Sequence, residues 1–121
     1  MRVKNIHWIS ITSKEAEVEV TDGHFNCTVF SQPCDVAVGD ALTEPMHILN
    51  MRNAQINTDS PPSITNTRKN TFEHKVVGVV NCLEEQIISV GKIILIADDY
   101  LPGGLKVGDK IEFECGRIDL W

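Results

Sequence analysis

Polar and apolar residues alternate along most of this chain with a period of two, which predicts β-strands. In residues 15–20 three glutamates alternate with one alanine and two valines, so one face of this strand is charged and the other apolar. Asp22-Gly23 follows, a pair typical of tight hairpin turns because glycine accepts a positive φ. The return segment places three apolar residues on one side: Phe25, Cys27 and Val29. We therefore expect a hairpin with one buried and one solvated face.

The second half of the chain repeats the layout of the first. Val38-Gly39-Asp40 recurs as Val107-Gly108-Asp109, at an offset of 69 (107 − 38), and Gly23 recurs as Gly91, at an offset of 68 (91 − 23). At the latter offset the positions expected to be buried also match: Val20 with Ile88, Phe25 with Ile93, Cys27 with Leu95, and Val29 with Ala97. This agreement predicts a duplicated unit, at residues 3–50 and again at 73–120.

Residues 53–71 interrupt the alternation. This segment is rich in Asn, Thr, Ser and Pro, and it contains Pro61-Pro62. Such a composition is typical of a linker or a surface loop. The strands of the two units are expected near residues 3–13, 15–21, 24–30, 41–50, 73–82, 86–90, 92–97 and 110–120.

These elements predict an all-β fold in a single domain that spans residues 1–121. The architecture we favour is one closed or nearly closed barrel of about eight strands; two abutting half-barrels are the alternative. The two Val-Gly-Asp turns resemble the Gly-Asp box of duplicated cradle-loop barrels. A Gly-Asp pair before a strand is also common in OB and SH3-like barrels, so the type of barrel stays open.

Two local features refine this picture. The last strand changes parity between Cys115 and Ile118, which predicts a β-bulge at Gly116 that would keep one continuous buried face. Residues 76–80 and 93–97 are apolar at both parities, so both faces of these strands need cover. We expect a homodimer or higher oligomer through these second-half strands; cover by residues 53–71 of the same chain is the alternative.

Charge and composition narrow the possible partners. The net charge of −6 disfavours nucleic acid, whose phosphates are neutralised by Lys and Arg, and it favours a basic protein. No apolar run approaches the length of a membrane helix and no signal peptide is recognisable, so we expect a cytoplasmic protein without membrane contact. In that compartment the four cysteines, Cys27, Cys34, Cys82 and Cys115, should be reduced thiols.

No residue set predicts catalysis, a metal site or a cofactor. His24 and Cys27 have the spacing of a zinc finger, but residues three apart on a strand face opposite sides. Cys34 is the loop cysteine, and the neighbouring Asp35 would disfavour its thiolate. The carboxylate pairs Glu84-Glu85 and Asp98-Asp99 are explained by turns and solvation.

The function we expect is therefore that of a non-enzymatic protein-binding module, for example an acidic inhibitor or immunity-type protein for a basic partner. The alternative is small-ligand binding, or a minor enzymatic role, in a cleft between the two units. Its candidate residues are Gln32, Asp35, Asp98, Asp99 and Tyr100. A third reading is single-stranded nucleic-acid binding by an OB-like barrel, for which Phe30 is the one suggestive outward aromatic residue.

Overall fold

The computed structural model describes residues 1–121 and contains eleven β-strands in one sheet, and no helix. The all-β prediction is thus confirmed. The strands are β1 (Arg2–Ser10), β2 (Glu15–Thr21), β3 (Asn26–Ser31), β4 (Met46–Leu49), β5 (Arg52–Ile56), β6 (Ser63–Asn66), β7 (His74–Cys82), β8 (Ile87–Val90), β9 (Ile93–Ala97), β10 (Lys110–Cys115) and β11 (Arg117–Leu120).

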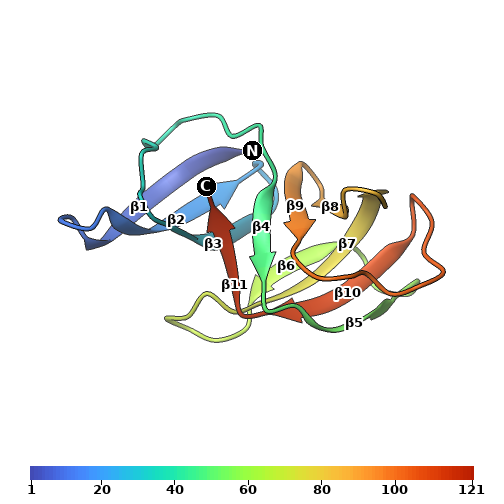
Figure 1. Ribbon diagram of the computed structural model, residues 1–121. Helices are drawn as coiled ribbons and strands as arrows, with labels where there is room; N and C mark the ends of the chain where they lie inside the picture. The colour runs from blue at the N-terminus through green and yellow to red at the C-terminus, as the bar shows by residue number, and fades with distance from the viewer.

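The sheet is open, so the barrel prediction is only partly confirmed. Neighbouring strands follow the order β1-β2-β3-β11-β4-β9-β8-β7-β10-β5, and β6 pairs with β7 beside this path. The end strands β1 and β5 do not pair with each other. In Figure 1 the strands form two groups, β1–β3 on one side and β5–β10 on the other, with β4 and β11 between them. This arrangement is closer to two half-barrels than to one closed barrel.

The linker prediction for residues 53–71 was incomplete. This segment contributes most of β5, which pairs with β10, and all of β6, which pairs with β7. Both strands are short and mostly polar, so their sequence carries no alternation that would reveal them. Their pairing depends on strands far along the chain rather than on their own pattern.

The last strand of each half pairs with the third strand of the other half. β4 lies parallel to β9, and β11 lies parallel to β3. β4 and β11 pair antiparallel with each other at the centre of the sheet, where Ile118 is opposite Ile48. Each half therefore completes the sheet of the other, and one hydrophobic cluster of 23 buried residues runs through both.

The two Val-Gly-Asp turns make the same hydrogen bonds. The amide of Val3 donates to the carbonyl of Asp40 over 2.9 Å, and the carbonyl of Val3 accepts the amide of Gly39 over 2.8 Å. Val80 makes the same two bonds, over the same distances, with Asp109 and Gly108. The glycines have φ values of 94° (Gly39) and 96° (Gly108), a region that disfavours other residues. Duplication itself stays a prediction, which this matched bonding supports.

Gly116 separates two strands rather than interrupting one ladder. β10 before it pairs with β7 and β5, whereas β11 after it pairs with β4 and β3. Cys115 and Ile118 are both fully buried at 0% exposure, so the parity change keeps one buried face, as the sequence predicts. The irregularity is larger than a bulge because the chain moves here from one group of strands to the other.

The outer face of the second-half strands is less exposed than the homodimer prediction assumes. Val77 is only 3% exposed within the single chain, and Ile94 and Ile96 are half-buried. The chain between β5 and β6 lies beside this face, where Lys110 Nζ donates to the carbonyl of Ser60 over 2.6 Å. The structure contains no second chain, so the oligomer stays a prediction.

Asp22 connects the hairpin turns of the two halves. Its Oδ1 accepts the amides of His24 (2.8 Å) and Phe25 (2.7 Å), and its Oδ2 accepts the amide of Lys92 over 2.8 Å. Burial raises the pKa of Asp22, but these three hydrogen bonds outweigh burial and hold it below its ordinary value. The turn comprises residues 22–25, between the paired Thr21 and Asn26, and is thus longer than the expected two-residue turn.

We predict that Gly78→Ala destabilises the fold. A Cβ at Gly78 would lie 2.5 Å from Cγ2 of Ile88 and 3.1 Å from the carbonyl oxygen of Ser89, so β7 and β8 would have to separate. Such overpacking costs roughly 1–3 kcal/mol, to be measured by urea unfolding. Gly103→Ala is the matched control, because a Cβ there meets no atom within 4 Å. Equal stability of the two variants would contradict this packing.

Candidate functional site

The five predicted site residues lie on the surface in two separate loops. In the loop after β3, Gln32 Nε2 donates to the carbonyl of Ser13 (3.4 Å), and Asp35 forms an exposed ion pair with Lys14 (3.3 Å). The loop after β9 holds the other three residues, Asp98, Asp99 and Tyr100. Here Asp99 Oδ1 accepts the amide of Tyr100 over 2.8 Å, and the Tyr100 residue is 90% exposed.

The small-ligand alternative requires these two loops to face each other across one cleft, and the sheet topology places them apart. β3 runs parallel to β11 and β9 runs parallel to β4, while β4 and β11 are antiparallel. β3 and β9 therefore run in opposite directions. The loops that follow them leave the sheet at opposite ends of its strands. Sequence reasoning placed the loops correctly within each half but had no information about the direction of one half relative to the other.

The largest concavity of the molecule lies elsewhere, although it also lies between the two halves. Its volume is about 350 Å³. One side comes from the start of β4 and the residues before it, and the other from the β7–β8 hairpin, β9 and the residue after β11. The lining residues are Glu44, Pro45, His47, Glu85, Ile96 and Trp121.

A stacked aromatic pair lines part of this concavity. The rings of His47 and Trp121 are 3.5 Å apart at an interplanar angle of 14°, and Trp121 is 80% exposed. Burial lowers the pKa of His47, and the nearby carboxylate of Asp119 partly opposes that shift. The pair thus offers a flat aromatic surface that is open to solvent.

A second stack lies beside the first on the same face of the sheet. Arg117 donates to both carboxylate oxygens of Asp119, over 2.6 and 2.9 Å, and its guanidinium lies 4.4 Å from the centre of the Phe30 ring. Phe30 also meets Phe72 edge to face, with ring centroids 5.7 Å apart. The Phe30 ring is therefore engaged by two residues of its own chain, whereas Trp121 is largely exposed to solvent.

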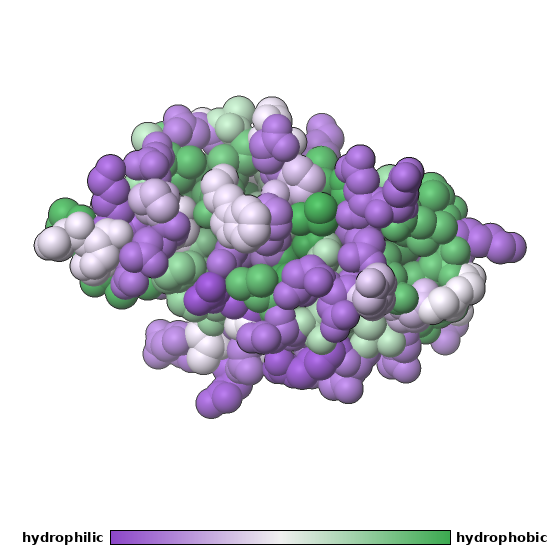
Figure 2. Space-filling model, viewed as in Figure 1, coloured by the Kyte–Doolittle hydropathy of each residue, from purple (hydrophilic) through white to green (hydrophobic).

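The chemistry of the concavity suits a cation on an apolar stem. Glu44 and Glu85 are exposed carboxylates at its rim, while Ile96 and Pro45 supply apolar surface. An indole face attracts cations through its quadrupole. The lining contains no hydroxyl or thiol nucleophile. Figure 2 shows hydrophilic residues over most of this side of the molecule.

Sequence reasoning missed these residues for a physical reason. His47 lies opposite Ile96 only because β4 and β9 pair in parallel across the two halves, a contact that no local pattern encodes. The parity of β4 does place His47 outward, between the buried Met46 and Ile48. That outward histidine, together with a tryptophan and nearby glutamates, was the available signal.

A smaller concavity of about 100 Å³ contains His74 and Cys27 but not a catalytic pair. His74 Nδ1 donates to the carbonyl of Phe72 over 2.9 Å, and Nε2 accepts the amide of Thr28 over 3.2 Å. Both ring nitrogens are thus occupied. Burial raises the pKa of the Cys27 thiol to about 12, so it is not a thiolate at neutral pH. His74 joins β3 to the start of β7 and serves a structural role.

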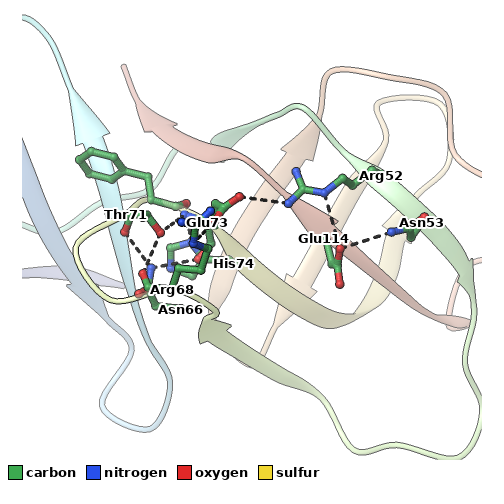
Figure 3. Close-up of polar contacts among 9 residues, drawn as sticks. Arg52, Asn53, Asn66, Arg68, Thr71, Glu73, His74 and Glu114 are labelled. Atoms are coloured by element: carbon green, nitrogen blue, oxygen red, sulfur yellow. Dashed lines mark hydrogen bonds and ion pairs between the residues drawn. The ribbon is translucent and has the colours of Figure 1, made fainter.

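A polar network next to His74 holds the turn between β6 and β7 (Figure 3). Glu73 lies between Arg52 (3.3 Å) and Arg68 (3.5 Å), and Arg52 also reaches Glu114 over 3.5 Å. Asn66 Nδ2 donates to the carbonyls of Thr71 and Glu73 over 2.8 and 2.9 Å. Each of these charged groups has an ion-pair partner in this chain. The network therefore has a structural role and needs no ligand to account for it.

The remaining candidate groups are metal ligands and thiols. No group of three or more His, Cys, Asp or Glu side chains is placed to hold a metal ion. The four cysteines are free, and Cys34 is buried at 4% exposure although it lies in a loop. The chain forms no helix of the length and apolar character needed to cross a membrane.

Comparison with known proteins identified no similar protein. No family model, no curated protein and no solved structure matches the chain.

We predict that His74 makes the stability of the protein pH-dependent. Burial lowers its pKa when the chain is folded, so below the unfolded value of about 6.5 the unfolded chain binds a proton that the folded chain does not. The free energy of unfolding should therefore fall as the pH drops from 7.5 to 5. In His74→Gln this fall should be smaller, and the stability at pH 7.5 should be lower by roughly 1–3 kcal/mol, because the bonds to Thr28 and Phe72 are weakened.

His47→Gln is the comparison, since His47 also has a lowered pKa but is less buried. It should flatten the pH dependence less than His74→Gln. Urea unfolding at a series of pH values measures both variants, and an unchanged slope in His74→Gln would contradict the structural role of this histidine.

We predict graded reactivity of the thiols toward Ellman's reagent. Burial raises the pKa of Cys27 to about 12 and of Cys115 to about 11, so both should react only as the protein unfolds. Cys82 is half-exposed and should react first. In denaturant four thiols should be counted; a count of two would show a disulfide, and rapid native labelling of Cys27 would contradict its burial.

Proposed function

We propose that the protein is a non-enzymatic binding module. It binds a basic segment of another protein in the concavity lined by His47 and Trp121. The observation that carries this proposal is an exposed indole that shares the largest concavity of the molecule with two carboxylates, those of Glu44 and Glu85. An arginine or lysine side chain of the partner would lie over Trp121 with its charge toward Glu44 and Glu85. An acidic inhibitor or immunity-type protein is one instance of this class.

The free energies of the expected contacts predict modest affinity at this one site. A cation over an exposed aromatic ring is worth about 0.5–1 kcal/mol, and an exposed ion pair contributes about as much or less. The net charge of −6 adds long-range attraction, which raises the association rate of a basic partner more than its final affinity. A partner that binds tightly must therefore contact further surface around the concavity.

A small organic cation is the second candidate ligand. The concavity lies between the two halves, and its volume of about 350 Å³ falls within the lower range of small-ligand sites. Nucleic acid is disfavoured by the net charge of −6, and Phe30, the residue expected to stack on bases, is engaged by Arg117 and Phe72. A cytoplasmic location belongs to the same proposal, because a reducing compartment would keep four free thiols reduced.

We predict that a short peptide rich in arginine binds at Trp121. Trp8→Phe leaves Trp121 as the only tryptophan, so its fluorescence reports occupancy of the concavity. The double change Glu44→Gln with Glu85→Gln should weaken binding about three- to tenfold, which corresponds to the loss of two exposed ion pairs. Trp121→Ala, followed by calorimetry, should weaken it about two- to fivefold, the range expected for one exposed cation–aromatic contact.

Glu84→Gln is the matched control, because Glu84 is exposed on the same hairpin but does not line the concavity. It should bind the peptide like the parent protein. Failure of the basic peptide to bind, or equal weakening by Glu84→Gln, would contradict the proposed site. Binding of arginine amide as tightly as the peptide would favour the small-cation candidate.

A further inference from the structure

One end of the sheet is open along most of strand β1. The loop before β4 covers only its start, where the amide of Val3 donates to Asp40 over 2.9 Å and Arg2 forms an isolated bridge with Ala41. The remaining length, residues 5–10, has β2 on one side and no strand on the other. The amide of Ile6 is bonded over 3.0 Å by the side chain of the neighbouring Asn5. An open edge of this kind is a template for another strand.

The same stretch carries the densest group of exposed apolar residues. Trp8 is 47% exposed, Ile9 54% and Ile11 76%, whereas Ile6 is half-buried against the core. Together the three exposed residues present on the order of 300 Å² of accessible surface per chain. They lie in the hairpin that projects from the β1–β3 group in Figure 1. Single exposed apolar residues need no explanation, but a contiguous group beside an open edge does.

The other end of the sheet lacks both features. β5 has five residues, begins with Arg52, and contains Asn53 with a positive φ of 56°. Of its apolar residues only Ile56 is largely exposed, at 49%. Short, charged and irregular edge strands resist pairing with another chain. Strand β1 also has register shifts, between Val3 and Asn5 and between Trp8 and Ser10, but its residues 5–8 pair one by one with β2. Residues 5–8 are therefore the part of the β1 edge that can accept another strand.

We propose that two copies of this chain pair through their β1 strands, antiparallel and related by a two-fold axis near His7. In that register Ile6 of each copy lies opposite Trp8 of the other, and the Asn5 side chain releases the Ile6 amide so that the two backbones bond across the edge. Aromatic and β-branched residues opposite each other on a sheet attract. The two Trp8 rings then extend the apolar face that Ile6 already shares with the core.

The area and the charges fit a second copy of the chain. A standard interface buries about 800 Å² per partner, of which somewhat more than half is apolar, so Trp8, Ile9 and Ile11 supply most of the apolar share. The β1 edge itself carries no carboxylate, although β2 presents three glutamates, so the pairing places no acidic residues of the two edges against each other. Because these three residues cover less than half of a standard interface, we expect a weak dimer, with a dissociation constant on the order of micromolar. This interface is separate from the concavity at Trp121 and from the second-half strands.

Analytical ultracentrifugation of the wild-type chain tests the proposal. At about 100 µM the mass should approach twice the 13.5 kDa of one chain. Trp8→Glu and Ile9→Glu should each raise the dissociation constant at least about tenfold. Both residues are about half-exposed, so thermal unfolding should show that the two variants stay folded. If Trp8→Glu does not fold, Ile9→Glu alone tests the interface.

Two control variants locate the interface. Val107→Glu, in the loop before β10, and Leu83→Glu, in the β7–β8 hairpin, change exposed apolar residues elsewhere and should both leave the dimer intact. A mass of 13.5 kDa for the wild type across the concentration range would overturn the proposal. Dissociation by Leu83→Glu but not by Trp8→Glu would equally overturn it.

Discussion

The pairing of β4 with β9 and of β11 with β3 is the contact on which the rest of this structure depends. Each half supplies a strand that the other half needs, so neither half has a complete sheet alone. The two exchanged strands meet at Ile48 and Ile118, which are both fully buried. Because one hydrophobic cluster runs through both halves, we expect them to fold as one cooperative unit rather than as two small domains.

Hydrogen bonds between the halves reinforce this exchange at its margins. Asp22 in the first hairpin accepts the amide of Lys92 in the second, and His74 at the start of β7 accepts the amide of Thr28 in β3. Thr28 lies beyond the last residue pair that β3 makes with β11, so the histidine satisfies an amide at the point where the ladder ends. These two side chains accept amides where backbone pairing stops, and of the two only His74 is buried.

The exchange also creates the candidate binding surface. The outer face of the central strands combines residues from both halves, and the concavity at His47 and Trp121 forms where β4 reaches β9. The equivalent outer position on β3 and β11 is occupied by Phe72, which packs on Phe30 beside Arg117. One side of the sheet centre is thus closed by the chain's own residues, and the other presents an aromatic surface between carboxylates.

Elements that depend on local chemistry were predictable from the amino-acid sequence. Alternation located seven of the eight expected strands to within a few residues, though only residues 46–49 of the expected 41–50 are strand. The parity change at Gly116 correctly kept Cys115 and Ile118 buried. The open sheet, the strands β5 and β6, and the stacking of His47 on Trp121 depend on long-range contacts and became visible in the folded chain alone. The same is true of the separation of Gln32 and Asp35 from Asp98–Tyr100. The reason is that strand parity is set by neighbouring residues, whereas the partner and direction of each strand are set by contacts between residues far apart in the chain, which leave no periodic signal.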